Sequence, residues 1–171
     1  MLYIYIDGSC RGNGKKDSQG GFGIVIFDDR RNLIDAYCKQ FDNVTNNQME
    51  LKAFLKTFEL LNTKYKNQQV TIYSDSAYCI NILTSWIYSW SKNNWKTAKG
   101  ETIKNLDIIL SLYKYYTIDF FINQINFTKV NGHKGIIGNE LADALATADK
   151  LKFSNIILQN HILIIPSEKT C

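Results

Sequence analysis

Two apolar runs, each followed closely by an aspartate, most constrain what this 171-residue chain can fold into. Residues 2–6 alternate leucine or isoleucine with tyrosine and lead into Asp7, while residues 70–73 lead through Ser74 into Asp75. This alternation has the period of a β-strand. Water should be scarce at the end of such a strand, so both aspartates are candidates for carboxylates that hold a metal ion.

The rest of the pattern predicts an α/β fold. Helices are expected at about residues 46–61, 76–83, 101–114 and 139–150, and strands at about 2–7, 21–27, 33–41, 69–74 and 118–129. This order predicts a five-stranded mixed sheet, with three antiparallel strands and then two parallel ones, flanked by helices. The first and fourth strands should be parallel neighbours.

Two further acids belong with the aspartates. Glu50 opens an amphipathic helical stretch that Thr45 or Asn46 should cap, and Asp143 lies near the start of the last predicted helix. Taken singly, Asp7 is also explained as a strand-end cap and Glu50 as a partner of the helix dipole. Functional groups of open α/β sheets collect beyond the carboxyl ends of parallel strands, where all four acids could meet. Four such carboxylates need a cation between them, which makes divalent-metal phosphoryl transfer the leading hypothesis.

Composition narrows the classes of protein. The 45% hydrophobic and 13% aromatic fractions exclude a disordered chain, and the net charge of +4 is compatible with a nucleic-acid partner. The four cysteines form no CxxC pair, which argues against zinc. The chain has no leader-like start and no apolar run of about 20 residues. We therefore expect an intracellular, cytoplasmic monomer that does not bind membranes.

Five sequence blocks resemble, in order, the motifs of the ribonuclease H type 1 family. They are DGSCRGN at 7–13, TNNQMEL at 45–51, SDS at 74–76, the Trp- and Lys-rich stretch 86–107, and the segment from Gly132-His133 to NELAD at 139–143. A single block would be weak evidence, whereas five in register over about residues 3–148 are very specific.

The resemblance implies a ribonuclease H-like fold and an endoribonuclease that cuts the RNA strand of RNA–DNA hybrids. It implies that Asp7, Glu50, Asp75 and Asp143 hold two Mg²⁺ ions, for which Mn²⁺ should substitute. The products would carry 5′-phosphate and 3′-hydroxyl ends. By the same resemblance His133, in a loop between two glycines, assists proton transfer or product release.

The resemblance also divides the substrate contacts between two strands. Cys10, Asn13 and Asn46 match positions that contact 2′-hydroxyls of the RNA strand, although Asn46 is equally apt as a helix cap. The DNA-side positions are Thr45 and Asn105 at a phosphate, and Tyr78, Trp86 and Trp90 along the sugars. Tryptophans four residues apart on a helix are also common in core packing. Lysines 92, 96, 99 and 104 give this region a basic character.

The predicted domain organisation is a catalytic domain at 1–150 followed by an extension of unknown role at 151–171. The apolar segments of this extension predict an extra strand on the domain, with docking of a partner as the alternative. Two other functions stay open: a non-catalytic hybrid-binding module, and a DNA endonuclease of the same fold. The first would need a lost carboxylate, and the TNNQMEL block and basic region argue against the second.

Overall fold

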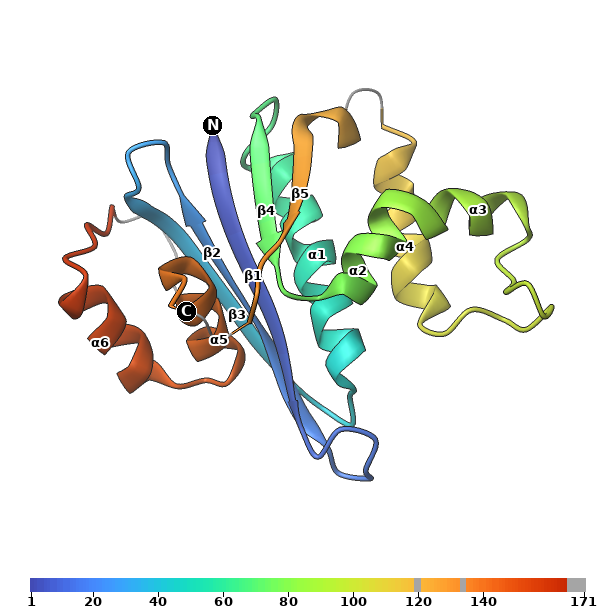
Figure 1. Ribbon diagram of the computed structural model, residues 1–171, viewed down its shortest axis with the longest axis horizontal. Helices are drawn as coiled ribbons and strands as arrows, with labels where there is room; N and C mark the ends of the chain where they lie inside the picture. The colour runs from blue at the N-terminus through green and yellow to red at the C-terminus, as the bar shows by residue number, and fades with distance from the viewer. Residues whose placement is uncertain (119–120, 133–134, 166–171) are drawn as a thin grey trace.

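A mixed five-stranded sheet lies at the centre of the protein (Figure 1). The computed structural model describes residues 1–118, 121–132 and 135–165. The sheet order is β3-β2-β1-β4-β5, and the strands are β1 (Leu2–Arg11), β2 (Gln19–Phe27), β3 (Leu33–Asp42), β4 (Val70–Ser74) and β5 (Ile125–Lys129). The first three strands are antiparallel, and β4 and β5 continue the sheet parallel to β1. The predicted fold class is therefore confirmed.

Helices cover both faces of this sheet (Figure 1). On one face, α1 (Asn46–Thr63) packs against β1 and β2, and α4 (Leu106–Tyr116) packs against α1. On the other face, α5 (Ile137–Ala146) packs against β2 and β1, and α6 (Lys150–Gln159) packs against α5. The two faces correspond to two separate hydrophobic cores.

The alternation of aliphatic and tyrosine side chains along β1 explains how this strand contributes to both cores. Leu2, Ile4 and Ile6 are buried on the α1 side, whereas Tyr3 and Tyr5 pack on the α5 side. Successive side chains of a strand point to opposite faces, so one strand supplies both layers. The β1 backbone is thereby held between two helices, and its carboxyl end is fixed in position.

The region after β4 is more helical than expected. The predicted helix at 76–83 extends to Lys92 as α2 (Ala77–Asn81), a π-helical turn η1 (Ile82–Trp86) and α3 (Ile87–Lys92). The next helix starts at Leu106 instead of residue 101, because Thr102 pairs with Lys96 in an isolated bridge and Asn105 is left-handed, with φ 58°. An αL residue cannot continue a right-handed helix, so α4 begins after Asn105.

The fifth strand is shorter than the predicted 118–129. It begins at Ile125, after a 3-10 turn η2 (Ile122–Gln124). The aromatic ring of Phe121 lies 5.5 Å from that of Phe58 in α1, which anchors the segment in the core. Phe121 therefore serves packing against a helix and not strand pairing, which the sequence pattern alone does not distinguish.

The carboxyl-terminal segment packs on the domain, but as a helix where a strand was expected. α5 ends at Ala146, Ala148 adopts a left-handed φ of 57°, and α6 follows with Ile156 buried. Up to residue 165, where the described part of this segment ends, strand-like pairing is a single parallel bridge between Leu33 and Ile164. None of the helices in the described ranges is long and apolar enough to cross a bilayer.

Candidate active site

Three of the predicted acids converge at the carboxyl edge of the two central parallel strands. Asp7 lies in β1, Asp75 directly follows β4, and Glu50 lies in the second turn of α1. One carboxylate oxygen from each residue lies within 4.8 Å of the other two. The sheet order explains this meeting, because β1 and β4 are parallel neighbours and Asp7 and Asp75 both lie two residues beyond the last parallel pair, Tyr5 and Tyr73. Asp7 is not the end of its strand, as the predicted range 2–7 implied, because β1 continues to Arg11 in antiparallel pairing with β2.

Asp143 joins them from the opposite face of the sheet, on α5. It is not a member of the tight group of three, but it lines the same pocket and lies close enough to raise the pKa of Asp7. The pocket has a volume of about 360 Å³. A water molecule takes about 30 Å³ of liquid volume, so cations with their waters have room here. The pocket is lined by Asp7, Gly8, Ser9, Asn46, Glu50, Asp75, Ser76 and Asp143.

Two glycines allow the helices to approach the sheet this closely. A Cβ atom on Gly8 would lie 2.3 Å from the backbone nitrogen of Glu50, and one on Gly23 would lie 2.1 Å from the carbonyl oxygen of Ala142. Gly23 is the partner of Asp7 in the β1–β2 register. Any larger residue at these two positions would push α1 or α5 outward and separate the acids.

Burial and mutual repulsion strongly perturb these acids. Asp7 and Glu50 are only 7% and 3% exposed. Burial, followed by the charges of Asp75 and Asp143, raises the pKa of Asp7 from 3.8 to about 8. Burial, followed by the charges of Asp7 and Asp75, raises the pKa of Glu50 well above its ordinary value. A buried anion without compensation is costly, so this arrangement favours a bound cation.

A comparison with Asp35 shows what this cluster lacks. The carboxylate of Asp35 is also buried, and it accepts hydrogen bonds of 2.6 Å each from Lys64 and from the hydroxyls of Tyr37 and Tyr65. By contrast, Oε2 of Glu50 is buried with no hydrogen-bond partner among the described residues. Buried polar atoms in native proteins are normally satisfied. Hard carboxylate oxygens of this kind fit Mg²⁺ or Mn²⁺.

Among the described residues, a basic side chain that the sequence motifs did not reveal reaches the site. Lys152 of α6 places its Nζ 2.5 Å from Oδ2 of Asp143. The only local signal is that Asp149 precedes Lys152 by three residues, the spacing of a helix cap that fixes the start of α6. That spacing does not reveal which acid the lysine would meet.

The residues predicted to contact RNA lie together beside the acids. The Cys10 thiol donates to the carbonyl of Val44 at 3.2 Å, and the side-chain oxygen of Asn13 accepts from the backbone of Asn46 at 3.0 Å. These contacts tie the end of β1 and the loop after it to the start of α1. Thr45 and not Asn46 caps the helix, through a capping box with Gln48. The Asn46 side chain is therefore not consumed by capping and lines the pocket.

The predicted DNA-side residues form a second cluster on α2, η1 and α3. The Trp86 ring lies 6.3 Å from that of Tyr78 and 5.6 Å from that of Trp90, and Trp86 is 39% exposed. Nδ2 of Asn105 lies 3.5 Å from the Tyr78 hydroxyl. Thr45 does not join this cluster through any contact that the structure records, and its hydroxyl accepts from Gln48. Lysines 92, 96, 99 and 104 are all exposed nearby.

His133 lies outside the described residues, so the structure does not place it relative to the acids. Its neighbour Gly132 does approach the site, because a Cβ atom there would lie 2.5 Å from Oδ2 of Asp75. The loop that contains the histidine therefore starts at the acidic pocket.

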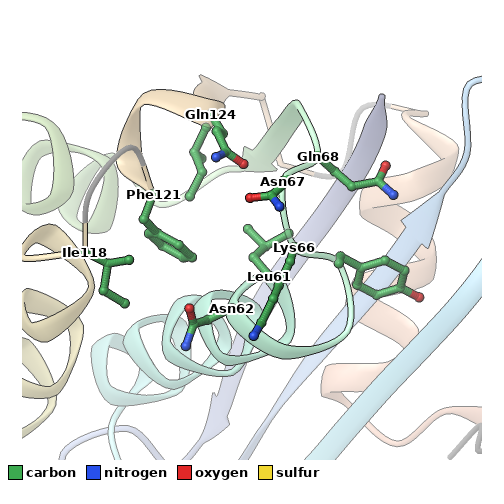
Figure 2. A pocket seen from close by; sticks show the side chains of 10 residues that line it. Leu61, Asn62, Lys66, Asn67, Gln68, Ile118, Phe121 and Gln124 are labelled. Atoms are coloured by element: carbon green, nitrogen blue, oxygen red, sulfur yellow. The ribbon is translucent and has the colours of Figure 1, made fainter.

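A different pocket, of about 140 Å³, lies at the opposite end of the parallel strands (Figure 2). It lies where α1 ends and β4 and β5 begin, and none of its described lining residues is acidic. Without carboxylates it offers no comparable metal chemistry. Its lining comprises Leu61, Asn62, Tyr65, Lys66, Asn67, Gln68, Ile118, Phe121, Gln124 and Ile125.

Comparisons with known proteins agree with this architecture. The family model described as RNase H matches residues 1–150. Ribonuclease HI of Pasteurella multocida (strain Pm70) is 39% identical over 149 residues, which is 86% of this chain and 88% of that protein.

Two solved structures share the fold at lower sequence identity. LC9-RNase H1, a type 1 RNase H with the type 2 active-site motif, is 22% identical with a TM-score of 0.72, covering 98% of this chain and 88% of that one. LC11-RNase H1, solved in complex with an RNA/DNA hybrid, is 20% identical with a TM-score of 0.62, covering 86% and 95%.

Proposed function

The chain belongs to the RNase H family of hydrolases, and from this we propose that it cuts the RNA strand of RNA–DNA hybrids with the help of two divalent cations. The observation that carries the proposal is the meeting of Asp7, Glu50 and Asp75 within 4.8 Å, in a pocket that Asp143 also lines. Mg²⁺ is the expected metal, and Mn²⁺ should replace it.

The carboxylates would hold the cations and thereby place the scissile phosphate. When bound, two cations supply an activated water and neutralise charge on the departing 3′-oxygen, which leaves 5′-phosphate and 3′-hydroxyl ends. Asp7 and Glu50 are held rigidly by β1 and α1, so they would orient the reacting groups in a site of restricted water access. His133 would move a proton or assist product release from the loop that begins at Gly132.

The surfaces on either side of the acids support a hybrid substrate. On one side, Cys10, Asn13 and Asn46 would meet the 2′-hydroxyls of the RNA strand, and an amide both donates to and accepts from a hydroxyl. On the other side, the exposed Trp86 and its aromatic neighbours would support the DNA strand. The exposed lysines would add affinity without base specificity.

Further DNA-side assignments belong to the same proposal. Asn105 and Thr45 would hold a DNA phosphate, and Tyr78 and Trp90 would line the channel for the sugars. The solved complex of LC11-RNase H1 with an RNA/DNA hybrid supports a hybrid as the substrate.

We also propose that residues 1–150 form the catalytic domain of a monomer and that residues 151–171 are an extension to it.

Substitution of one cation ligand tests the proposal. Asp75→Asn should lower hybrid cleavage by more than about a hundredfold, because even residues that only orient a ligand are worth 10- to 100-fold. Binding of a labelled hybrid should change little. Asp29→Asn, the same chemical change in the exposed β2–β3 turn, is the control.

The outcomes separate the competing functions. Full activity of Asp75→Asn would refute metal-assisted cleavage at this site. A wild-type protein that binds the hybrid and cleaves nothing would instead favour a non-catalytic hybrid-binding module, and one that cuts duplex DNA would favour the DNA endonuclease.

A further inference from the structure

The helix α6, which starts where the family match ends, sends one lysine back into the acidic site. We propose that Lys152 is a positioning residue that holds Asp143 and, through its positive charge, sets the cation concentration at which the site fills. This inference rests on the proposed function only in taking the acidic pocket to be a cation site.

The contact is short and partly shielded from solvent. Nζ of Lys152 lies 2.5 Å from Oδ2 of Asp143, and their side chains are 39% and 14% exposed. The geometry leaves Oδ1 of Asp143 as the oxygen not engaged by the lysine. Asp143 would therefore face a cation with one oxygen while the other stays on Lys152.

The fold delivers Lys152 to this place by a defined turn. The left-handed Ala148 ends the α5 segment, and the Asp149 side chain then accepts from the backbone nitrogen of Lys152 at 2.9 Å. Four residues later on the same helix face, Ile156 is buried in the core shared with α5. Capping at one end and burial one turn later fix the start of α6, so the lysine stem leaves from a rigid position.

The positive charge of Lys152 beside the four acids explains how this residue would affect cation affinity. In the described parts of the chain, no other lysine or arginine forms an ion pair with the four acids. Lys152 thus offsets one of the four negative charges before a cation arrives. Once a dication is bound, the ammonium repels it, and at a separation of about 6 Å this repulsion equals roughly tenfold in affinity even at the dielectric constant of water. Salt screens this repulsion, so we expect Lys152 to lower the affinity for the cation about three- to tenfold.

An ordinary surface ion pair is the competing explanation. Such pairs contribute little to folding and nothing to cation affinity, so replacing the lysine would alter stability slightly and leave metal binding unchanged. The two explanations therefore predict different results for cation binding by the protein without substrate.

Calorimetric titration of the substrate-free, full-length protein with Mg²⁺, and separately with Mn²⁺, distinguishes them. Lys152→Met should lower the Kd for the cation about three- to tenfold and enlarge the rise in Tm that the cation causes. Lys152→Arg keeps the charge and should stay within about twofold of wild type. The control is Lys150→Met, the same loss of charge on an exposed lysine of the same helix, and it should also stay within about twofold.

Four results would overturn the inference. They are a Kd for Lys152→Met that is unchanged or raised, an equal gain in cation affinity in Lys150→Met, a gain in cation affinity in Lys152→Arg, and a wild type that binds neither cation.

Hybrid cleavage is measured separately on the same proteins. A folded wild type that cleaves no hybrid, beside a Lys152→Met that binds Mg²⁺ more tightly, would refute the proposed function and leave the role of Lys152 intact.

Discussion

Replacing Asp7 with asparagine should make the metal-free protein more stable, although Asp7 lies at the centre of the candidate active site. The two side chains have nearly the same shape, so the 7%-exposed position should accept asparagine without a cavity. What changes is the ability of the side chain to ionise. The variant removes an acid that burial and the neighbouring carboxylates keep from ionising.

The magnitude follows from proton binding. In the unfolded chain Asp7 ionises near its ordinary pKa of 3.8, whereas in the folded metal-free protein its pKa is about 8. Between these values the folded state binds more protons at Asp7, so the contribution of Asp7 to stability is fully present below pH 3.8 and is lost as the pH rises to about 8. Each pH unit in this window costs about 1.4 kcal/mol, so the loss at pH 7 is on the order of 4 kcal/mol at most.

Asp7→Asn should recover about 2–4 kcal/mol of the lost free energy of unfolding at pH 7. This is a large part of the roughly 5–15 kcal/mol by which a typical domain is stable. Some pH dependence should remain, because burial still raises the pKa of Glu50 in the variant. Mg²⁺ should stabilise the wild type strongly and the variant weakly, since the cation neutralises the charge that the substitution removes.

Urea denaturation at pH 5, 7 and 9, with and without Mg²⁺, measures these effects. Asp28→Asn is a control that should change stability in the opposite direction. Desolvation alone would raise the pKa of Asp28, but hydrogen bonds from Asn32 and Arg30 lower it. That variant should lose stability at neutral pH. An Asp7→Asn protein that is less stable than wild type at pH 7 without metal, or that keeps the full pH slope, would refute the reasoning.

Three further predictions concern the reaction and the substrate. His133→Ala should slow hybrid cleavage by about a hundredfold or more without abolishing it and leave hybrid affinity unchanged, measured by single-turnover kinetics; unaltered rates would exclude a role in proton transfer. Trp86→Ala should weaken hybrid binding by about 1 kcal/mol, measured by fluorescence anisotropy, because its exposed ring would lie against the DNA strand; unchanged affinity would assign it to packing. The double variant Lys96→Gln, Lys99→Gln should lower the slope of log K against log salt by roughly one to two, and an unchanged slope would place these lysines away from the phosphates.

The positions of Asp7 and Asp75 beside the parallel strands were more predictable from the sequence than the contacts made by helices. Asp7 and Asp75 were predictable because both follow the stretch in which β1 and β4 pair in parallel, and that geometry follows from strand order. The predicted end of the first strand at Asp7 was wrong, because β1 continues to Arg11 beside β2. Glu50 followed from helix periodicity, and Asp143 from the motif that contains it. Each of these signals is local to a strand or a helix.

Contacts that depend on chain reversals were not predictable in this way. The pair between Lys152 and Asp143 depends on the left-handed Ala148 and on burial of Ile156, which are results of tertiary packing. Likewise, α4 starts five residues later than expected because Asn105 adopts φ 58°. Propensity scales treat such residues as ordinary helix or loop members, and only the packed fold selects their conformation.

The most direct test of the central claim is one cleavage experiment on three substrates. A labelled RNA–DNA hybrid, an RNA–RNA duplex and a DNA–DNA duplex would be incubated with the wild-type protein, with and without Mg²⁺, and the product ends identified. We predict cleavage of the RNA strand of the hybrid only, dependent on Mg²⁺, with 5′-phosphate and 3′-hydroxyl ends. Cleavage that persists after removal of divalent cations, or that is equally fast on duplex DNA, would contradict this account.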